Sequence, residues 1–404
     1  MKKDIVIIGA GASALICASF IDQSKYNVSI LEKNTKAGRK ILISGNGKCN
    51  ITNENIHIEN FYSSNISFVG NILKKFTKDD TVKFFEKLGL PLYVGKDGQM
   101  FPLSNQSSSV VEYLENFVLN LGVKIIYEFG VQTITKEADK FIISSANGDI
   151  KADKVIIATG GKSMSKLGTT GDGYTIAQSF SHTIIEPKPA LVQLLSESKY
   201  LSKLSGVKHY SNITLISNNE KLSTQKGDVL FTNYGLSGLA ILDISRDVIE
   251  ELSNYAYVQI SIDLFRDYSN EKLKNLLQKC FKNSINDPIT ALGGVINKKI
   301  SSVVIEELKI DTNKLASELN TKEINKIVYL LKNFRFDITG DKGFDTAEVT
   351  TGGVCVDEID KDTLESKKVK DLYFCGEVLD VDGDRGGYNF QWAWSSGVVL
   401  AKNL

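Results

Sequence analysis

The sequence contains only three histidines and five cysteines in 404 residues. The histidines are scattered along the chain, so neither a zinc site nor a Ser-His-Asp triad is favoured. The cysteines, at positions 17, 49, 280, 355 and 375, form no CxxC pair and show no metal-ligand spacing. We therefore expect reduced thiols, with Cys17 and Cys375 in the core, and no metal site.

Net charge and long apolar runs are also absent. Lys and Arg together number 48, as do Asp and Glu, which argues against a dedicated nucleic-acid coat or a polybasic membrane anchor but leaves room for a local basic patch. No apolar run reaches the ~20 residues of a membrane span, and the N-terminal residues do not fit a signal peptide. These features predict a cytoplasmic protein of two or three domains.

The first 53 residues carry the strongest pattern in the chain. An apolar run at 5–8 ends in Gly9, Gly11 and Ala14, a helical pattern follows, and a second apolar run ends in Glu32. Gly9 permits a sharp turn, Gly11 lets the backbone approach a pyrophosphate, and Ala14 allows close packing. The acid at position 32 favours a ribose without a 2′-phosphate, so this βαβ unit is expected to bind FAD or NAD rather than NADP.

Two further segments of the first domain are informative. The segment AGRKILISGNGKCNITN, directly after the acid, combines glycines with cations that include Lys40 and Lys48. Such a loop can press against a flat ligand and neutralise a pyrophosphate, whereas a solvated basic loop is the alternative. Downstream, apolar spacing predicts one helix over residues 68–90.

Later segments suit the flavin half of a cofactor. A buried strand at 155–158 ends in ATGG, and a strand at 372–375 ends in Gly376 and Glu377. The turn GGYN then opens a helix at 390–401. A carboxylate at a strand end can bind a polyol such as ribityl, and N–H groups at a helix N-terminus can stabilise negative charge on a reduced flavin. The acidic loop DVDGD lacks the ligand spacing of an EF-hand loop, so we do not expect a calcium site there.

The middle of the chain has a different character, and we interpret it as an insertion. Two prolines in EPKP mark a crossing between domains. Short β runs occupy residues 188–265, and helical periodicity occupies residues 268–335. The predicted fold is α/β. A Rossmann-like FAD-binding domain is formed by residues 1–187 and 336–404, and an inserted β-barrel plus helical-bundle domain, the expected substrate domain, spans 188–335.

The motifs together resemble a known family. GRKILISGNGKCNITN, VIIATGG, GTTGDGY and CGEVLDVDG…GGYNFQWAWSSG are similar to segments of the BaiN/RdsA (YhiN-like) family of FAD-dependent oxidoreductases, and the resemblance extends over essentially the whole chain. Two departures stand out: the usual SGGGRCN is here SGNGKCN, with Lys48 in place of a fork-shaped Arg, and the loop before GGYN is unusually acidic. The resemblance implies FAD contacts at Gly9, Gly11, Ser13, Ala14, Glu32, Lys33, Gly38, Lys40, Ser44, Gly45, Gly47, Lys48, Cys49, Asn50, Val131, Ala158, Thr159, Gly160, Gly376, Glu377, Asp380, Gly387, Tyr388, Asn389 and Phe390.

A flavin implies hydride or electron transfer. No second GxGxxG follows a strand, so we expect NAD(P)H to dock transiently at the flavin, or else the substrate itself to reduce it. The resemblance implies, as the leading hypothesis, reduction of uridine to dihydrouridine in 23S ribosomal RNA, by hydride transfer to C6 and protonation at C5. The alternatives are a small-molecule oxidase or enone reductase, similar to aminoacetone oxidase, and a non-catalytic flavin-binding module.

The inserted domain offers a hint about a partner. Lys199, Lys203 and Lys208 lie in a lysine-rich stretch, residues 188–226, with a net charge of +4. Such a stretch would suit the phosphate backbone of ribosomal RNA. An ordinary solvated surface, balanced by downstream acids, is an equal alternative.

One residue is singled out for catalysis. Cys49 lies in the glycine-flanked loop expected near the flavin, and the adjacent Lys48 would lower the pKa of its thiol, so Cys49 is the candidate proton donor. A packing cysteine is the alternative. Tyr388 and His182 are further candidates.

Overall fold

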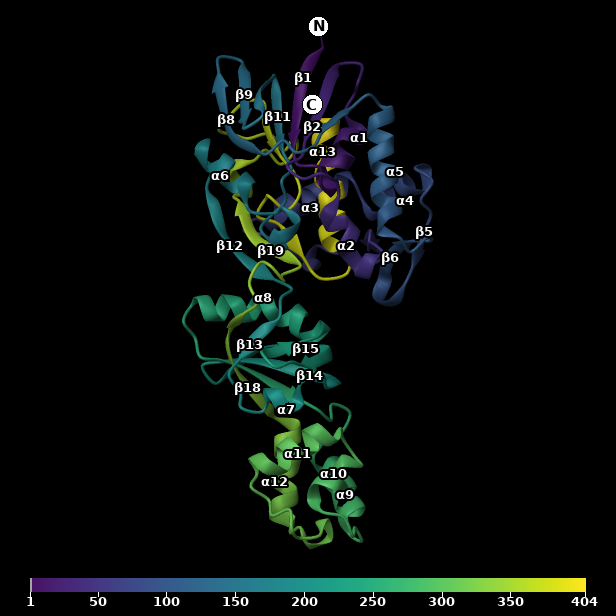
Figure 1. The fold of residues 1–404 in the computed structure, drawn as a ribbon, viewed down its shortest axis with the longest axis vertical. Helices are drawn as coiled ribbons and strands as arrows, with labels where there is room; N and C mark the ends of the chain where they lie inside the picture. Colours follow the sequence, from purple (N-terminus) through teal and green to yellow (C-terminus); the bar gives the residue numbers. More distant parts are fainter. Residues whose placement is uncertain (1) are drawn as a thin grey trace. The chain divides into compact units, whose positions relative to one another are not determined.

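The computed structural model describes residues 2–404 and divides into two compact units, each with its own hydrophobic core (Figure 1). Unit 1 comprises Met1–Pro189 and Glu348–Leu404, and unit 2 comprises Ala190–Ala347. Unit 2 ends later than position 335, where the sequence suggested the insertion ends, because strand β18 (Phe334–Asp341) pairs within the β-barrel of that unit.

A five-stranded sheet forms the centre of unit 1, and all of its neighbouring strands are parallel. Its order is β20 (Leu372–Phe374), β11 (Lys154–Ile157), β1 (Lys3–Ile8), β2 (Tyr26–Leu31) and β7 (Lys124–Ile126). The strands are apolar and largely buried along their length, as expected for a parallel sheet that is covered on both faces. This strand order is that of a dinucleotide-binding domain.

Helices and a smaller sheet flank the parallel sheet. Helices α1 (Ala12–Phe20), α5 (Ser107–Asn120) and α13 (Tyr388–Lys402) pack to the right of it in Figure 1. An antiparallel sheet of β8 (Val131–Glu137), β9 (Lys140–Ser145) and β10 (Gly148–Ala152) contacts β1 and β11. Every residue of α13 from Gln391 to Ala401 is buried, so this C-terminal helix is a core element of the unit.

The prediction of a single helix over residues 68–90 is wrong. The structure has two helices, α3 (Ile66–Lys75) and α4 (Lys78–Lys87), because Thr77 caps α4 and exchanges hydrogen bonds with Asp80 in a capping box. The other elements of unit 1 are α2 (Arg39–Gly47), α6 (Asp172–Ser179), β3 (Thr52–Asn53), β4 (Phe61–Tyr62), β5 (Leu92–Val94), β6 (Gln99–Pro102), β12 (Ile184–Ala190), β19 (Val349–Val354) and β21 (Asp382–Gly383).

Unit 2 combines a closed barrel with a group of helices. The barrel strands run in the order β13 (Leu194–Ser196), β16 (Gly235–Ser237), β15 (Glu220–Phe231), β14 (Lys208–Ser217), β17 (Val258–Asp263) and β18. Helix α8 (Leu239–Ser253) packs against β15, and a short α7 (Leu201–Leu204) contacts α11.

Four helices form the second part of unit 2: α9 (Asn270–Phe281), α10 (Pro288–Gly293), α11 (Lys298–Glu307) and α12 (Thr321–Lys332). Each begins at a residue whose side chain accepts a backbone N–H, which is Ser269, Asp287, Asn297 and Asn320 in turn. The predicted α/β class, with a Rossmann-like domain, a β-barrel and a helical part, is confirmed. Among residues 2–404, none of the helices combines the length and apolar character that crossing a membrane requires.

Candidate functional site

The predicted cofactor contacts gather at three places in unit 1. About half follow the carboxyl ends of the parallel strands, with Gly9 after β1, Glu32 after β2, Ala158 after β11 and Gly376 after β20. These ends meet at one edge of the sheet, which is where open α/β sheets bind ligands. The second place is α2 with the turn after it, which holds Gly38, Lys40, Ser44, Gly45, Gly47, Lys48, Cys49 and Asn50, and the third is the start of α13, which holds Gly387, Tyr388, Asn389 and Phe390.

The glycine turn after β1 leaves space for a ligand. Gly9 has a φ of +97°, and a Cβ on it would lie 2.8 Å from the backbone oxygen of Ala158. Gly11, by contrast, is the N-cap of α1 with a φ of −84°, and a Cβ on it would meet no protein atom within 4 Å. The backbone of Gly11 therefore borders open space at the positive end of α1, a position suited to a pyrophosphate.

Glu32 ties this turn to the end of β2. Its side chain is buried, with Oε2 accepting the N–H of Ala10 at 2.8 Å and Oε1 accepting the N–H of Asn34 at 2.8 Å. The N–H of Phe129 donates to the backbone oxygen of Glu32 at 2.9 Å, which brings the start of β8 at Val131 to the same edge. These two backbone N–H groups and the Asn34 side-chain amide, which donates to Oε1 at 2.6 Å, hold the carboxylate in place beside the expected ribose position.

Helix α2 begins beside the glycine turn, since the N–H of Gly38 donates to the backbone oxygen of Ala10 at 2.9 Å. The last part of α2 departs from helical geometry and forms a left-handed turn that continues past the helix, with a φ of 55° at Asn46 and of 60° at Cys49. Asn46 stands where the resembling family usually has glycine, and Asn tolerates this conformation better than most residues. The replacement therefore keeps the shape of the loop.

Cys49 lacks the properties expected of a proton donor. Its thiol is fully buried, and burial raises its pKa to about 12 although a hydrogen bond with Ser44 acts in the opposite direction. The expectation that Lys48 lowers this pKa is wrong, because the Lys48 side chain is exposed while the thiol turns into the core. The structure favours the packing interpretation of Cys49.

The next residue, Asn50, does have a side chain that a ligand could use. Its side chain is buried, and within residues 2–404 its Oδ1 atom has no hydrogen-bond partner. Buried polar atoms normally have a partner, so a donor on a bound ligand would complete this one. A Cβ on Gly47 would also meet open space. Together with the space at Gly11, these observations fit a bound dinucleotide cofactor.

Lys40 and Glu377, 337 residues apart, form an ion pair with Nζ and Oε2 at 2.7 Å. Ser163 joins them by accepting from Lys40 at 2.6 Å and donating to Glu377 at 3.0 Å. The backbone N–H of Thr350 donates to the same carboxylate at 2.9 Å. Ser163 and Thr350 were not predicted, although both stand beside paired glycines in GGKS and TTGG, a signal that could have identified them.

Tyr174 on α6 was also missed. Its hydroxyl is buried and, within residues 2–404, lacks a hydrogen-bond partner; it lies 3.2 Å from the position of a Cβ on Gly161. Burial, together with the charges of Glu377, Asp380 and Asp382, raises the pKa of this hydroxyl. The group therefore stays protonated and is available to donate to a ligand.

Lys33 and Asp380 are engaged with the protein. Lys33 Nζ lies 2.5 Å from Asp172 Oδ2 and donates to the Thr170 hydroxyl at 2.6 Å. Asp380 accepts the N–H of Ser64 at 2.9 Å, and burial raises the pKa of its carboxyl. Both side chains are satisfied without a cofactor, so neither position by itself indicates one.

The start of α13 packs against the strand that follows the Cys49 turn. A Cβ on Gly387 would lie 2.5 Å from the backbone oxygen of Thr52, and the Asn53 amide donates to the backbone oxygen of Gly386 at 2.9 Å. The GGYN turn is thus brought to the segment that begins with the glycine-rich loop, although more than 330 residues separate the two in sequence.

Three predicted contacts at this helix start have protein partners. The Tyr388 hydroxyl donates to the backbone oxygen of Asn55 at 3.3 Å, the Asn389 amide bonds the backbone of β21, and the Phe390 ring stacks on Trp394 with centroids 5.5 Å apart. These side chains position α13. Its first N–H groups are what a cofactor could use here.

His182 is not available for catalysis. Its ring is buried between Glu358, at 3.1 Å from Nδ1, and Ser366, at 2.7 Å from Nε2. Burial lowers the pKa of His182 despite the nearby carboxylate. Both ring nitrogens have partners, so the residue is structural. In the described part of the chain, residues 2–404, no group of three His, Cys, Asp or Glu side chains is arranged to hold a metal ion.

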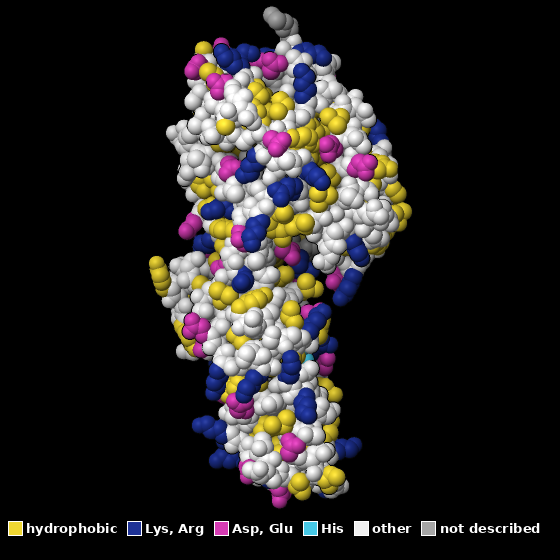
Figure 2. Space-filling view, in the orientation of Figure 1, with side chains coloured by type: hydrophobic (Ala, Val, Ile, Leu, Met, Phe, Trp, Pro, Cys, Tyr) yellow, Lys and Arg dark blue, Asp and Glu magenta, His cyan; other side chains and the backbone are white. Residues whose placement is uncertain are grey.

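The three lysines expected to form a basic face of unit 2 are each paired with a carboxylate. The pairs are Lys199 with Glu307 at 3.7 Å, Lys203 with Glu306 at 2.5 Å, and Lys208 with Asp228 at 2.8 Å. Figure 2 likewise shows Lys and Arg side chains interspersed with Asp and Glu over unit 2. These lysines therefore do not form an unpaired basic surface.

The comparisons with known proteins cover nearly the whole chain. Residues 3–403 match the family model described as HI0933-like protein Rossmann domain. The 3-dehydro-bile acid delta(4,6)-reductase of Clostridium scindens is 34% identical over 98% of both chains. The ribosomal RNA dihydrouridine synthases of Haemophilus influenzae and Escherichia coli are 33% and 31% identical, over 99% and 100% of this chain and 98% of each relative.

A comparison with a solved structure supports the fold alone. The 3-ketosteroid delta1-dehydrogenase from Sterolibacterium denitrificans aligns over 99% of both chains with a TM-score of 0.53 and 10% identity. The family match and the full-length relatives confirm the resemblance found in the motifs. The chain belongs to the HI0933-like family of FAD-dependent oxidoreductases.

Proposed function

We propose that this enzyme reduces uridine to dihydrouridine in 23S ribosomal RNA, with NAD(P)H as the electron donor. The observation that carries the proposal is the match of 99% or more of the chain, unit 2 included, to two ribosomal RNA dihydrouridine synthases at 31% and 33% identity. Such a substrate would also place the enzyme in the cytoplasm.

The site residues have distinct proposed tasks around the cofactor. Gly11 at the start of α1 would face the pyrophosphate, Glu32 would accept from the ribose, and Asn50 would use its unpartnered oxygen to bind a donor on the ligand. When bound, reduced FAD supplies a hydride for the electron-poor carbon of a conjugated carbonyl, such as C6 of uracil.

The ion pair of Lys40 and Glu377 would fix the polar boundary of the site. Because Glu377 also accepts from Ser163 and Thr350, its carboxylate cannot rotate without losing three hydrogen bonds. The Tyr174 hydroxyl is protonated and without a protein partner in the described chain, so it would donate to the ligand. The N-terminus of α13 presents positive partial charge for an anionic edge of the ligand.

NAD(P)H is proposed to dock transiently at the flavin. Within residues 2–404 the structure has one parallel sheet of the dinucleotide-binding kind, and its glycine turn is the one assigned to FAD. A reductase with a dedicated nicotinamide domain would need a second such turn after a strand.

The decisive experiment maps dihydrouridine in large-subunit ribosomal RNA by mass spectrometry. A strain that lacks the enzyme is expected to lose dihydrouridine at one or more positions, and expression of the wild-type chain is expected to restore it. The Gly11→Val variant, whose added side chain occupies the pyrophosphate space, should not restore it. Unchanged dihydrouridine in the deletion strain would contradict the proposed function.

A second candidate is reduction of a conjugated ketone in a steroid-like small molecule. The 34% identical relative is named as a reductase of a bile acid. Exposed apolar side chains occur on α2 and around the β5–β6 hairpin, namely Ile43, Val94 and Leu103, and Phe101 of this hairpin contacts the glycine-rich loop at Gly45. Anaerobic reoxidation of the reduced flavin distinguishes the candidates, because only the steroid-like candidate predicts rapid reoxidation by a 3-oxo-Δ4 steroid in the absence of RNA.

A further inference from the structure

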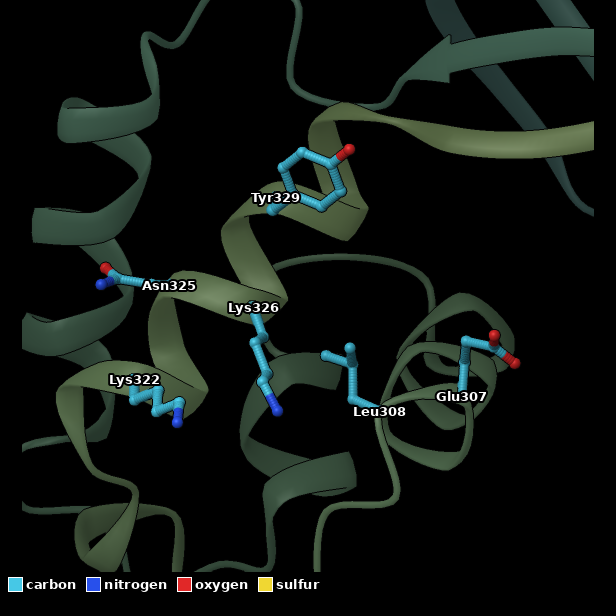
Figure 3. Close-up of a pocket in the computed structure, with 6 residues that line it drawn as sticks. All are labelled: Glu307, Leu308, Lys322, Asn325, Lys326 and Tyr329. Atoms are coloured by element: carbon cyan, nitrogen blue, oxygen red, sulfur yellow. The ribbon is translucent and has the colours of Figure 1, made fainter.

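Unit 2 has an open cavity of about 510 Å³ between the end of α11 and one face of α12 (Figure 3). Its lining residues are Glu307 and Leu308 at the end of α11 and Lys322, Asn325, Lys326 and Tyr329 on α12. The four α12 residues follow the spacing i, i+3, i+4 and i+7, so they share one face of the helix, and all four are exposed. We call this surface the α12 face.

The opposite side of α12 anchors the helix. Ile324, Ile327, Val328 and Leu331 are buried in the core of unit 2, and the Asn320 side chain caps the helix. The α12 face is therefore presented by a fixed element rather than by a loop.

The lysines of the α12 face differ from those predicted as the basic surface. Within residues 2–404, neither Lys322 nor Lys326 forms an ion pair with a carboxylate. The acidic lining residue, Glu307, accepts a hydrogen bond from the Tyr200 hydroxyl at 2.5 Å and faces Lys199 at 3.7 Å, so its charge is partly offset. Lys326 also interacts electrostatically with Glu323, but that carboxylate is already paired with Lys314 at 2.5 Å. Two ammonium groups outside any salt bridge of the described chain are thus available to an anionic ligand.

An aromatic ring accompanies these charges. The Tyr329 side chain is 60% exposed and extends from the same face as Lys326 (Figure 3). Exposed rings beside unpaired cations suit single-stranded nucleic acid, because a base stacks on the ring while phosphates contact the cations. Residues 269–333, which include this helical part, carry 11 lysines and 7 acidic residues. The surrounding charge therefore also favours a polyanion.

We propose that the α12 face binds an unpaired segment of the RNA substrate, with phosphates at Lys322 and Lys326, a base stacked on Tyr329, and Asn325 available to a polar base edge. The inference rests on the proposed function for the identity of the RNA. It assigns to the helical part of unit 2 a recognition role separate from the cofactor site of unit 1.

The test measures binding of the FAD-loaded full chain to fluorescent transcripts that tile 23S ribosomal RNA, over a range of salt concentrations. Lys322→Ala with Lys326→Ala is expected to lower the slope of log affinity against log salt by about 1.4, since each single-strand phosphate contact contributes about 0.7. Tyr329→Ala is expected to weaken binding at least ~5-fold, whereas Tyr329→Phe keeps the ring and the affinity.

A matched control removes two exposed lysines at the end of α9, by Lys279→Ala with Lys282→Ala. This variant should retain the wild-type salt slope. Equal effects of the two lysine pairs, or a wild-type chain that does not bind the transcripts, would overturn the inference. Displacement of the RNA by poly-glutamate at equal affinity would also overturn it, since the face would then serve an acidic protein.

Dihydrouridine mapping separates this inference from the proposed function. Lysine-dependent RNA binding without any change of dihydrouridine in the deletion strain supports the α12 face and contradicts the uridine reductase. Dihydrouridine that is lost on deletion, with binding unaffected by the α12 substitutions, supports the reductase and contradicts the α12 face. Thermal unfolding of each variant verifies that unit 2 remains folded.

Discussion

Gly9 and Gly11 lie two residues apart in one turn, yet their missing side chains serve different purposes. Gly9 adopts a φ of +97° against the backbone of Ala158, so glycine is required there by the fold itself. Gly11 has an ordinary φ of −84° and borders open space, so the fold alone does not require glycine there, and the proposed pyrophosphate contact would explain it. Both positions could be identified from the GxGxxA pattern, whereas the distinction between them required the structure.

Alanine substitutions at these two positions are expected to separate folding from cofactor binding. Gly9→Ala should lower the unfolding free energy of the apoprotein by about 1–3 kcal/mol because of backbone strain. Gly11→Ala should leave that free energy nearly unchanged and reduce the flavin that remains bound. Urea unfolding of the apoprotein and flavin absorbance of the purified proteins measure the two effects. Equal loss of stability in both variants would contradict the assignment.

Cys49 shows why neighbours in sequence mislead. Lys48 and Cys49 are adjacent, and from the sequence alone the lysine should favour a thiolate. In the folded chain the left-handed turn exposes Lys48 and buries the thiol. The pair of Lys40 and Glu377 is the converse case, because two residues 337 positions apart meet only once the sheet has formed. Local chemistry is thus visible in a sequence, but the direction of each side chain is not.

Thiol alkylation of the native protein tests this account of Cys49. A pKa of about 12 leaves roughly one thiol in 10,000 ionised at pH 8, and the sulfur is inaccessible. Cys280 is exposed and should react first, whereas Cys49, Cys17 and Cys375 should react only after unfolding. Mass-spectrometric mapping of iodoacetamide adducts gives the order. Rapid modification of Cys49 in the folded protein would restore it as a candidate proton donor.

At the scale of elements, apolar periodicity predicted where helices occur better than where they end. The apolar spacing continues through Phe76, so α3 and α4 looked like one helix, although Thr77 and Asp80 in TKDD carry a capping signal. The start of α13 was clearer: the helix, expected from residue 390, begins at Tyr388 directly after Gly387, whose φ of +106° favours glycine. Helix ends depend on single hydrogen bonds, which the spacing of apolar residues does not reveal.

One short element, the 3-10 turn Val356–Glu358, ties the residues just before β12 to the C-terminal part of unit 1. Glu358 accepts from Lys368 at 2.6 Å, from the Thr183 hydroxyl at 2.8 Å and from the Thr183 N–H at 2.9 Å, and contacts His182 at 3.1 Å. Burial acts to raise its pKa, but the hydrogen bonds outweigh burial and hold it at about 2.

This element predicts an acid-dependent loss of stability. The pKa of Glu358 falls from 4.5 to about 2 on folding, so its contribution, up to about 3 kcal/mol, is present above pH 4.5 and is lost as the pH falls toward 2. The pKa of His182 is also lowered, so stability already declines as the pH falls below 6.5. Glu358→Gln should remove the Glu358 contribution while retaining the decline due to His182.

Urea unfolding between pH 7 and pH 3 measures both contributions. The wild-type chain should exceed Glu358→Gln by about 2–3 kcal/mol at pH 7, and the difference should shrink below pH 4.5. Glu86→Gln, at an exposed position of α4, serves as the control and should show no such pH dependence. A difference that stays constant with pH would show that the ion pair and hydrogen bonds of Glu358 do not explain its role.

At the scale of the molecule, composition and motif order predicted a discontinuous cofactor domain around an insertion. The start of the insertion followed from the prolines of EPKP, close to the unit boundary after Pro189. Its end at 335 was placed too early, since the segment RFDIT is equally compatible with either unit until β18 is seen to pair with β13 and β17. Strand pairing over long separations is the information that a single sequence does not provide.

Removal of FAD should therefore affect the two units differently. The hydrophobic core of unit 1 contains β1, β11 and α13, next to the proposed cofactor site, while the core of unit 2 is built from other residues of the barrel and the helices. A ligand stabilises only the structure that binds it, by about 2.7 kcal/mol when its free concentration is 100 times its Kd.

Hydrogen exchange of the holoprotein and the apoprotein should show faster exchange in β1, β11 and α13 of the apoprotein. Exchange in α9, α11 and α12 should remain unchanged. Equal loss of protection in both units would mean that FAD stabilises the chain as one cooperative body, and the separation into a cofactor unit and a recognition unit would then be incorrect.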